Sequence, residues 1–184
     1  KGGLTVKRAG KAQKFVTLDG QERTLDPDDL MVCDDDQPLA LAGTMGGLSS
    51  EITQTTTEIA LEAVRFDPVC IAKNSRRHKL SSEASRRLER SVDPALAQFA
   101  SARFVQLLTE HSSAVHVATV VAGEPIYPAV VKIDPTYISK ILGFEVSNAD
   151  VARILRLIGC DVDEKSWTVD PPSWRSDLVG VADF

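Results

Sequence analysis

The stretch from Leu39 to Pro94 holds the residues whose types and spacing suggest a functional site. Glu62 lies within Glu58–Phe66, a short apolar segment that predicts a buried strand. Strand alternation places Glu62 on one face with Ala60 and Val64. A carboxylate on a buried face needs a partner, and one that lines a cavity offers an acceptor to a ligand. An exposed glutamate on an open sheet face is the competing interpretation.

A glycine-dense segment, Gly43-Thr44-Met45-Gly46-Gly47, directly follows a predicted strand, Leu39–Ala42. Glycine permits positive φ and lets another molecule approach the backbone closely. The segment lacks the Gly-Lys-Ser/Thr ending of a P-loop and the GxGxxG spacing of a dinucleotide site. Taken alone, it predicts a tight turn.

Hydrolase and metal sites are weakly supported. Ser82 or Ser85 with His78 and Glu62 has the right residue types for a serine hydrolase, but the sequence lacks the GxSxG elbow. The three histidines, His78, His111 and His116, fall in a predicted loop, helix end and strand. The cysteines, Cys33, Cys70 and Cys160, show no CxxC spacing, which predicts free thiols in a reducing compartment.

Charge is unevenly distributed. The net charge of −5 over 184 residues disfavours a free-standing DNA-binding protein. A local cluster of basic residues is nevertheless suited to a phosphate backbone: Arg76, Arg77, His78, Lys79, Arg86, Arg87 and Arg90. A solvated helical face paired with Glu83 and Glu89 is the alternative. No apolar run approaches the roughly 20 residues that a membrane span requires.

The predicted fold class is α+β, with a mixed or antiparallel sheet and packed helices followed by a small winged-helix-like module. Early strands are predicted at Leu4–Arg8, Lys14–Leu18, Gln21–Leu25, Leu30–Cys33 and Leu39–Ala42, with a hairpin turn at Asp19-Gly20. Helices are predicted from Pro68 to Arg77, from Ser82 to Arg90 and from Asp93-Pro94 to His111. The last helix carries an apolar stripe expected to pack: Leu96, Phe99, Ala100, Phe104, Leu107 and Leu108.

A second unit follows a strand at His116–Val121 and a linker at 123–128. It comprises a strand at Val130–Ile133, a helix from Asp134-Pro135 to Gly143, a helix capped by Asn148, and a hairpin of Cys160–Glu164 with Trp167–Asp170. This order is typical of a winged helix. The second helix, with Val151, Ile154, Leu155 and Ile158 expected inward, carries only Arg153 and Arg156 as cations and is a poor reader of the major groove. An extended arm is expected from Ser173.

These motifs resemble, in order and spacing, the β subunit of bacterial phenylalanyl-tRNA synthetase. The resemblance rests on LALAGTMGG (39–47), ALEAVRFDPV (60–69), SRRHKLSSEASRRLERSVDPAL (75–96), YPAVVKIDPTYISKILG (127–143), ILRLIGCDV (154–162) and VDPPSWRSD (169–177). It implies an N-terminally truncated editing domain at 1–122, the linker at 123–128, the winged-helix-like module at 129–172 and an arm at 173–184 that leads to a catalytic-like domain.

The resemblance also implies a function. The whole enzyme is a cytoplasmic αβ heterotetramer that uses ATP and Mg²⁺ to join phenylalanine to its tRNA, and this region hydrolyses mischarged tyrosyl-tRNA. The expected partners are the α subunit and phenylalanine tRNA, with no membrane and no DNA. The alternative is a non-catalytic scaffold or nucleic-acid-binding module.

Site residues carry over from the resemblance. Glu62 accepts from the tyrosine hydroxyl, and the remaining editing-pocket residues are Gly43, Gly46, Gly47, Ser82 and Ala84, with serine where the family has threonine. Candidate tRNA contacts are Arg76, Arg77 and Lys79. Asp177 and Asp183 match part of a magnesium-linked acidic run, an incomplete site that is expected to hold no metal here. No residue is assigned as the catalytic general base.

Overall fold

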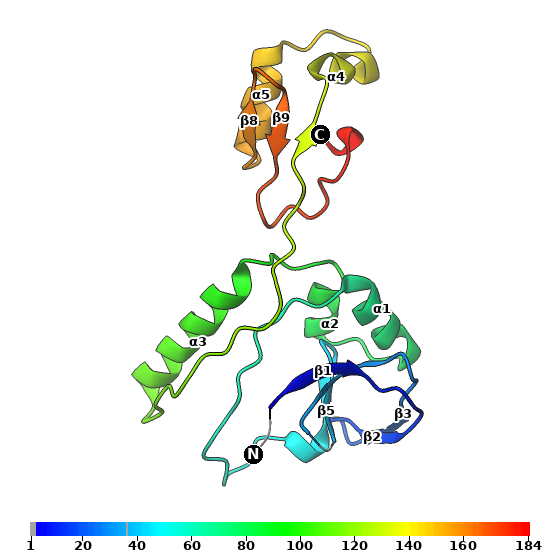
Figure 1. Cartoon of the computed structure of the whole chain (residues 1–184), viewed down its shortest axis with the longest axis vertical. Coiled ribbons are helices and arrows are strands. Elements are labelled where there is room, and N and C mark those ends of the chain that lie inside the picture. Colours follow the sequence, from blue (N-terminus) through cyan, green and yellow to red (C-terminus); the bar gives the residue numbers. More distant parts are fainter. Residues whose placement is uncertain (1–2, 36) are drawn as a thin grey trace. The chain divides into compact units, whose positions relative to one another are not determined.

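The computed structural model describes residues 3–35 and 37–184, which divide into two units, Lys1–Val92 and Asp93–Phe184 (Figure 1). The units are described separately. Small antiparallel sheets with packed helices make up the fold, which confirms the predicted α+β class. No helix in the described part of the chain is long and apolar enough to cross a membrane.

The first unit is built on a four-stranded antiparallel sheet in the order β1-β4-β5-β6. Its strands are β1 (Thr5–Arg8), β4 (Leu30–Cys33), β5 (Pro38–Leu41) and β6 (Met45–Gly46). A separate hairpin joins β2 (Lys14–Val16) to β3 (Glu22–Thr24), as the Asp19-Gly20 signal predicts. The Asp19 carboxylate accepts from Gln21 N at 3.2 Å, and Gly20 adopts φ +75°, so the turn chemistry is the expected kind.

Successive residues of β4 enter two different cores because strand side chains alternate between faces. Met31 belongs to a buried cluster with Phe15, Leu25, Leu41 and Leu80. Val32 belongs to a second cluster. That second cluster is completed by residues from the helices and the segments beside them: Ala42, Phe66, Ile71 and Leu88.

Helices α1 (Pro68–Arg77) and α2 (Glu83–Leu88) contribute Ile71 and Leu88 to this second cluster, which contains Val32 of β4. Helix α1 begins where the Asp67 carboxylate accepts from Cys70 N at 2.8 Å, and Pro68 occupies the first turn. Helix α2 has Ser82 as its N-cap, with a capping box completed by the Ser85 hydroxyl in place of an acid. Both predicted helix starts are confirmed.

The predicted strand at Glu58–Phe66 is wrong. These residues form no strand, and those from 58 to 62 are exposed. A strand is defined by hydrogen bonds to a neighbouring strand. No strand of the described sheets pairs with this segment, and β1 and β6 remain the edges of the four-stranded sheet. Only the end of the segment is anchored in the core, through Phe66.

Helix α3 (Leu96–His111) is present, but its predicted packing stripe is not buried. No residue of α3 is buried, and Phe99 is 72% exposed. The predicted strand at His116–Val121 is likewise wrong, since the structure gives these residues no strand pairing. Their apolar side chains are therefore left facing solvent, with Val117 93% exposed.

The rest of the second unit has the predicted strand–helix–helix–hairpin order. Its elements are β7 (Val131–Lys132), α4 (Pro135–Leu142), α5 (Asn148–Leu157), β8 (Asp161–Asp163) and β9 (Thr168–Asp170), with sheet order β7-β9-β8. Asp134 caps α4 as expected, and Gly143 ends it at φ +75°. The N-cap of α5 is Ser147 rather than Asn148, because its hydroxyl accepts from Asp150 N at 3.1 Å.

The core of this module includes residues beyond the hairpin. Val151, Leu155 and Val169 are buried together with Leu178, which is 1% exposed. The residues from Ser173 onward therefore do not leave as an extended arm, because Leu178 packs into the module. Ile154 in α5 and Ile158, which directly follows α5, were expected inward but are exposed, whereas Ala152 is buried. Two short 3-10 turns, η1 (Leu48–Ser50) and η2 (Val181–Asp183), complete the secondary structure described.

Candidate functional site

The glycine turn packs tightly against its own domain. Gly43 adopts φ +60°, and a Cβ at this position would lie 2.9 Å from both Ile71 Cδ1 and Leu88 Cδ1. A Cβ on Gly47 would lie 2.7 Å from Leu39 O and Phe15 Cζ, and one on Gly46 would lie 3.0 Å from Leu18 Cδ1. The space that the absent side chains leave beside these glycines is therefore filled by atoms of the same domain.

Ser82 connects the glycine turn to helix α2. Its hydroxyl donates to Thr44 O at 2.6 Å and accepts from Ser85 N at 3.1 Å. The hydroxyl thus acts as both donor and acceptor within the protein. These two bonds hold the glycine turn against the start of α2. Ala84, one residue into α2, is exposed.

Glu62 has no hydrogen bond or ion pair with any described residue, and the residue keeps an exposed surface. Desolvation by neighbouring groups nevertheless raises the pKa of its carboxyl above the ordinary value. Four residues further on, Phe66 belongs to the cluster that surrounds Gly43. Phe66 thus anchors this segment beside the glycine turn, but no described hydrogen bond or ion pair joins Glu62 itself to the turn or to Ser82.

The segment after Glu62 contains a second incompletely bonded group. Arg65 donates from Nη2 to Ser91 Oγ at 3.3 Å, and its buried Nε has no hydrogen-bond partner among the described residues. This bond joins the segment to the end of α2, where Ser91 adopts φ +66°. Sequence reasoning gave Arg65 no role.

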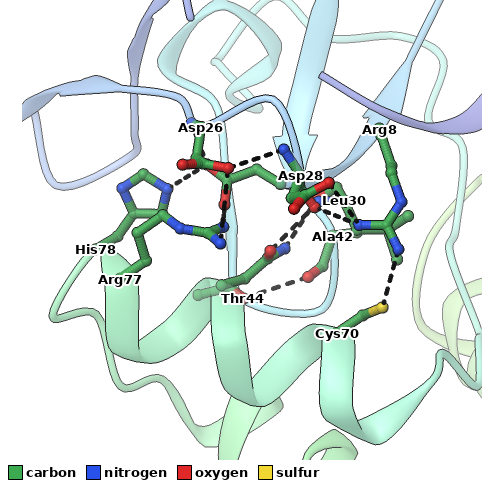
Figure 2. Close-up of polar contacts among 11 residues, drawn as sticks. Arg8, Asp26, Asp28, Leu30, Ala42, Thr44, Cys70, Arg77 and His78 are labelled. Atoms are coloured by element: carbon green, nitrogen blue, oxygen red, sulfur yellow. Dashed lines mark hydrogen bonds and ion pairs between the residues drawn. The ribbon is translucent and has the colours of Figure 1, made fainter. Parts of the chain in front are cut away.

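A buried ion-pair network fixes the end of α1, and it was missed by sequence reasoning. The Asp29 carboxylate is fully buried and binds both Arg77 and His78; the His78 Nε2 contact is 2.6 Å and Asp26 N donates at 2.8 Å. Figure 2 shows Arg77 and His78 reaching from the end of the helix toward the turn that carries Asp26. The sequence gives no signal for this network, because carboxylates are seldom fully buried.

This network separates the basic residues into two groups. Arg77 is an internal ion-pair partner of Asp29 and also lies 3.6 Å from Asp26. Arg76 and Lys79 are exposed, and neither has a carboxylate partner in the described chain. Lys79 adopts φ +51° just beyond the C-cap residue His78, so it lies in the turn that precedes Ser82.

The two alternative chemistries lack support in the geometry. His78 bonds Asp29, and no described hydrogen bond joins it to Ser82 or Ser85, so a Ser-His pair is absent. The pKa of Asp177 is lowered chiefly by its hydrogen bonds from Arg175, and Asp183 accepts from Gly180 N at 2.8 Å. Both carboxylates are thus bonded within the second unit, and residues 3–35 and 37–184 contain no group of three metal-ligating side chains. The magnesium role implied for Asp177 and Asp183 stays a prediction.

Comparison with known families also finds two domains, but the first match extends beyond Val92, where the structure divides the chain, and includes helix α3. Residues 1–113 match the B3/4 domain model, and residues 131–184 match the tRNA synthetase B5 domain model. The chain therefore belongs to the tRNA synthetase proteins that carry a B3/4 domain followed by a B5 domain.

The resemblance to the β subunit of bacterial phenylalanyl-tRNA synthetase is confirmed. The phenylalanine–tRNA ligase beta subunit of Streptomyces avermitilis is 43% identical over 192 residues, covering 100% of this chain and 23% of that protein. The corresponding subunits of Cutibacterium acnes and Corynebacterium efficiens are each 42% identical, covering 100% of this chain and 22% of those proteins. The chain thus spans less than a quarter of the length of these relatives.

Proposed function

We propose that this chain is the part of a phenylalanine–tRNA ligase β subunit that removes tyrosine from mischarged tRNA. In this proposal the whole enzyme works in the cytoplasm as an αβ heterotetramer and forms phenylalanyl-tRNA with ATP and Mg²⁺. Its partners are the α subunit and phenylalanine tRNA. The names of the similar subunits support the ligase assignment.

The observation that carries the editing role is the state of Glu62. The residue keeps an exposed surface, but neighbouring groups desolvate its carboxyl enough to raise the pKa, and it accepts no hydrogen bond from the described residues. The hydroxyl of a tyrosyl group would donate to this carboxylate and supply the missing partner. A phenylalanyl group would leave the carboxylate unpaired, and a site built to bond a hydroxyl discriminates strongly against an analogue without one.

The proposed pocket wall consists of the glycine turn and the start of α2. Gly43, Gly46 and Gly47 keep the turn close to the core, and the Ser82 hydroxyl fixes Thr44. In this arrangement Ser82 and Ala84 shape the wall and position the aminoacyl end. Because the Ser82 hydroxyl is already bonded twice, it is not a free nucleophile. We assign no catalytic general base.

The basic residues at the end of α1 are proposed to contact the tRNA. Arg76 and Lys79 are exposed without a carboxylate partner in the described chain, which suits them to phosphate groups. Arg77 is a weaker candidate for direct contact, because binding a phosphate would compete with its ion pair to Asp29. Loss of Arg77 would instead disturb the helix end that carries the other two residues.

The test is deacylation of tyrosyl-tRNA by the full heterotetramer, comparing wild type with Glu62→Ala. Loss of tyrosine clearance, with phenylalanine charging retained, is expected. The matched control is Glu58→Ala, because Glu58 is an exposed glutamate of the same segment. Equal clearance by wild type and Glu62→Ala would favour the alternative, in which this region is a non-catalytic scaffold or nucleic-acid-binding module.

A further inference from the structure

The hairpin of β2 and β3 contacts the glycine turn directly. Just after β2, the Leu18 N–H donates to Gly46 O at 3.0 Å. The preceding residue, Thr17, is fully buried and forms an isolated antiparallel bridge with Gly47. The hairpin therefore fixes one side of the glycine turn, although no site motif in the sequence includes it.

The same hairpin also contacts the loop between α1 and α2, through Arg23 on β3. Arg23 Nη1 donates to His78 O at 2.8 Å. His78 is the C-cap of α1, and the carbonyl groups at the end of a helix have no partner within that helix. Among the described hydrogen bonds, Arg23 supplies the only one to His78 O. The hairpin thus holds the backbone of the loop at the point where α1 ends.

Arg23 is held firmly at its other two nitrogens. Nε donates to Thr17 Oγ1 at 2.9 Å, and Nη2 pairs with Asp19 Oδ2 at 2.7 Å. The side chain is only 11% exposed. A planar guanidinium with a partner on each nitrogen has a fixed orientation, which the single ammonium of a lysine would not reproduce. Arg23 therefore fixes the position of His78 O relative to the hairpin.

A third contact closes a ring of three segments. Ser82 Oγ donates to Thr44 O at 2.6 Å, which joins the loop after His78 back to the glycine turn. The hairpin contacts the turn, the turn contacts Ser82, and the chain from Ser82 leads back to the carbonyl that Arg23 holds. The position of Ser82 relative to the glycine turn therefore depends on Arg23 as well as on the direct bond.

We propose that Arg23 is a positioning residue for the deacylation of tyrosyl-tRNA, an inference that rests on the proposed editing function. Arg23 acts through the loop and not by contact with the substrate. By holding His78 O, it keeps Ser82 and Ala84 at the distance from the glycine turn that the aminoacyl end requires. A misplacement of about 1 Å at a reacting centre costs about 100-fold in rate.

The first test is deacylation of tyrosyl-tRNA by the full heterotetramer carrying Arg23→Met. The matched control is Lys14→Met, because Lys14 is a 64% exposed cation of the same hairpin that pairs with Glu22 at the surface. Arg23→Met is expected to lower kcat about tenfold and to change KM less than about threefold, since the aminoacyl end is misplaced while tRNA still binds. Lys14→Met should change neither. An unchanged kcat in Arg23→Met would overturn the proposal.

A double-mutant cycle with Ser82→Ala separates positioning from a general loss of stability. Residues that act through one network have non-additive effects. The Arg23→Met and Ser82→Ala variants combined should therefore lower kcat little more than the more damaging one alone, with phenylalanine charging retained by each enzyme. Effects that multiply would overturn the positioning role. Unchanged tyrosine clearance in Glu62→Ala, measured in parallel, would instead contradict the proposed recognition by Glu62.

Hydrogen exchange tests the ring without any substrate. In the full heterotetramer, Arg23→Met is expected to speed exchange of the amides of residues 79–82, because their loop has lost its contact with the hairpin. Lys14→Met should leave these amides unchanged. Equal exchange in Arg23→Met and wild type would overturn the proposal whether or not the enzyme removes tyrosine from tRNA.

Discussion

His78 Nε2 lies 2.6 Å from Asp29 Oδ2, and Asp29 is completely buried. The same carboxylate binds Arg77, so the Asp29 side chain contacts both residues at the end of α1. Beyond His78 the chain passes through Lys79 at φ +51° to Leu80, which is in the core, and to Ser82. The position of Ser82 at the candidate pocket thus depends on a carboxylate that no site motif contains.

Replacing Asp29 with Ala is therefore expected to destabilise the first unit. Removing one partner of a buried ion pair typically costs about 3–5 kcal/mol, because the remaining charge is left uncompensated. Hydrogen exchange of the α1 and α2 amides measures this loss. Asp28→Ala is the control, since Asp28 is 72% exposed and its 3.6 Å ion pair with Arg8 is a surface contact. Equal protection in the two variants would argue against the network.

Gly43→Ala tests the close packing of the glycine turn. The added methyl group would meet Ile71 and Leu88 at 2.9 Å in a backbone conformation of φ +60°. We expect a loss of about 1–3 kcal/mol in the free energy of unfolding, beyond the strain of positive φ. Gly20→Ala provides that reference, because Gly20 has φ +75° and nothing within 4 Å of the added Cβ. Similar losses in urea unfolding would mean that the turn is loosely packed.

Glu62 should make stability depend on pH. Desolvation raises its pKa in the folded state above the ordinary value of 4.5, so folding favours the protonated form. Its favourable contribution is complete below pH 4.5 and is lost as the pH rises through the raised pKa. Unfolding free energies measured across this range should fall less for Glu62→Gln than for wild type. Identical pH profiles would show that Glu62 is fully solvated.

Leu178→Ala tests whether the last residues belong to the winged-helix module. Leu178 is 1% exposed within the core that contains Val169, and such truncations cost about 2–5 kcal/mol. Trp167 and Trp174 both lie in this unit and report its unfolding by fluorescence. Val179→Ala is the neighbouring control, because Val179 is 72% exposed and should change stability by less than about 0.5 kcal/mol. An equally small effect at Leu178 would contradict its burial in the module and would support the extended arm expected from the sequence.

Elements specified by local chemistry were predictable from the sequence. The caps at Asp67, Ser82 and Asp134 and the turn at Asp19-Gly20 need only neighbouring residues, and the structure contains each of them. The strands expected at Glu58–Phe66 and His116–Val121 were wrong because a strand also requires a paired neighbour. An apolar pattern cannot identify that neighbour.

The candidate site shows the same distinction. The resemblance to the family assigned the glycine turn and Ser82 to one site, and the structure joins them through Thr44 O. Their dependence on Asp29 was not predictable, because Asp29 and Arg77 are 48 positions apart and a buried aspartate gives no local signal. The roles of Glu62, Ser82 and Ala84 toward a substrate remain proposals.

The central claim is most directly tested by the ratio of deacylation kcat/KM for tyrosyl-tRNA over phenylalanyl-tRNA, measured with the intact heterotetramer. A hydrogen bond to a charged group contributes about 1.5–3 kcal/mol, so Glu62→Ala should lower this ratio roughly 10- to 100-fold. Glu58→Ala should leave it unchanged. An undiminished preference for tyrosyl-tRNA in Glu62→Ala would contradict the proposal that this carboxylate recognises the tyrosine hydroxyl.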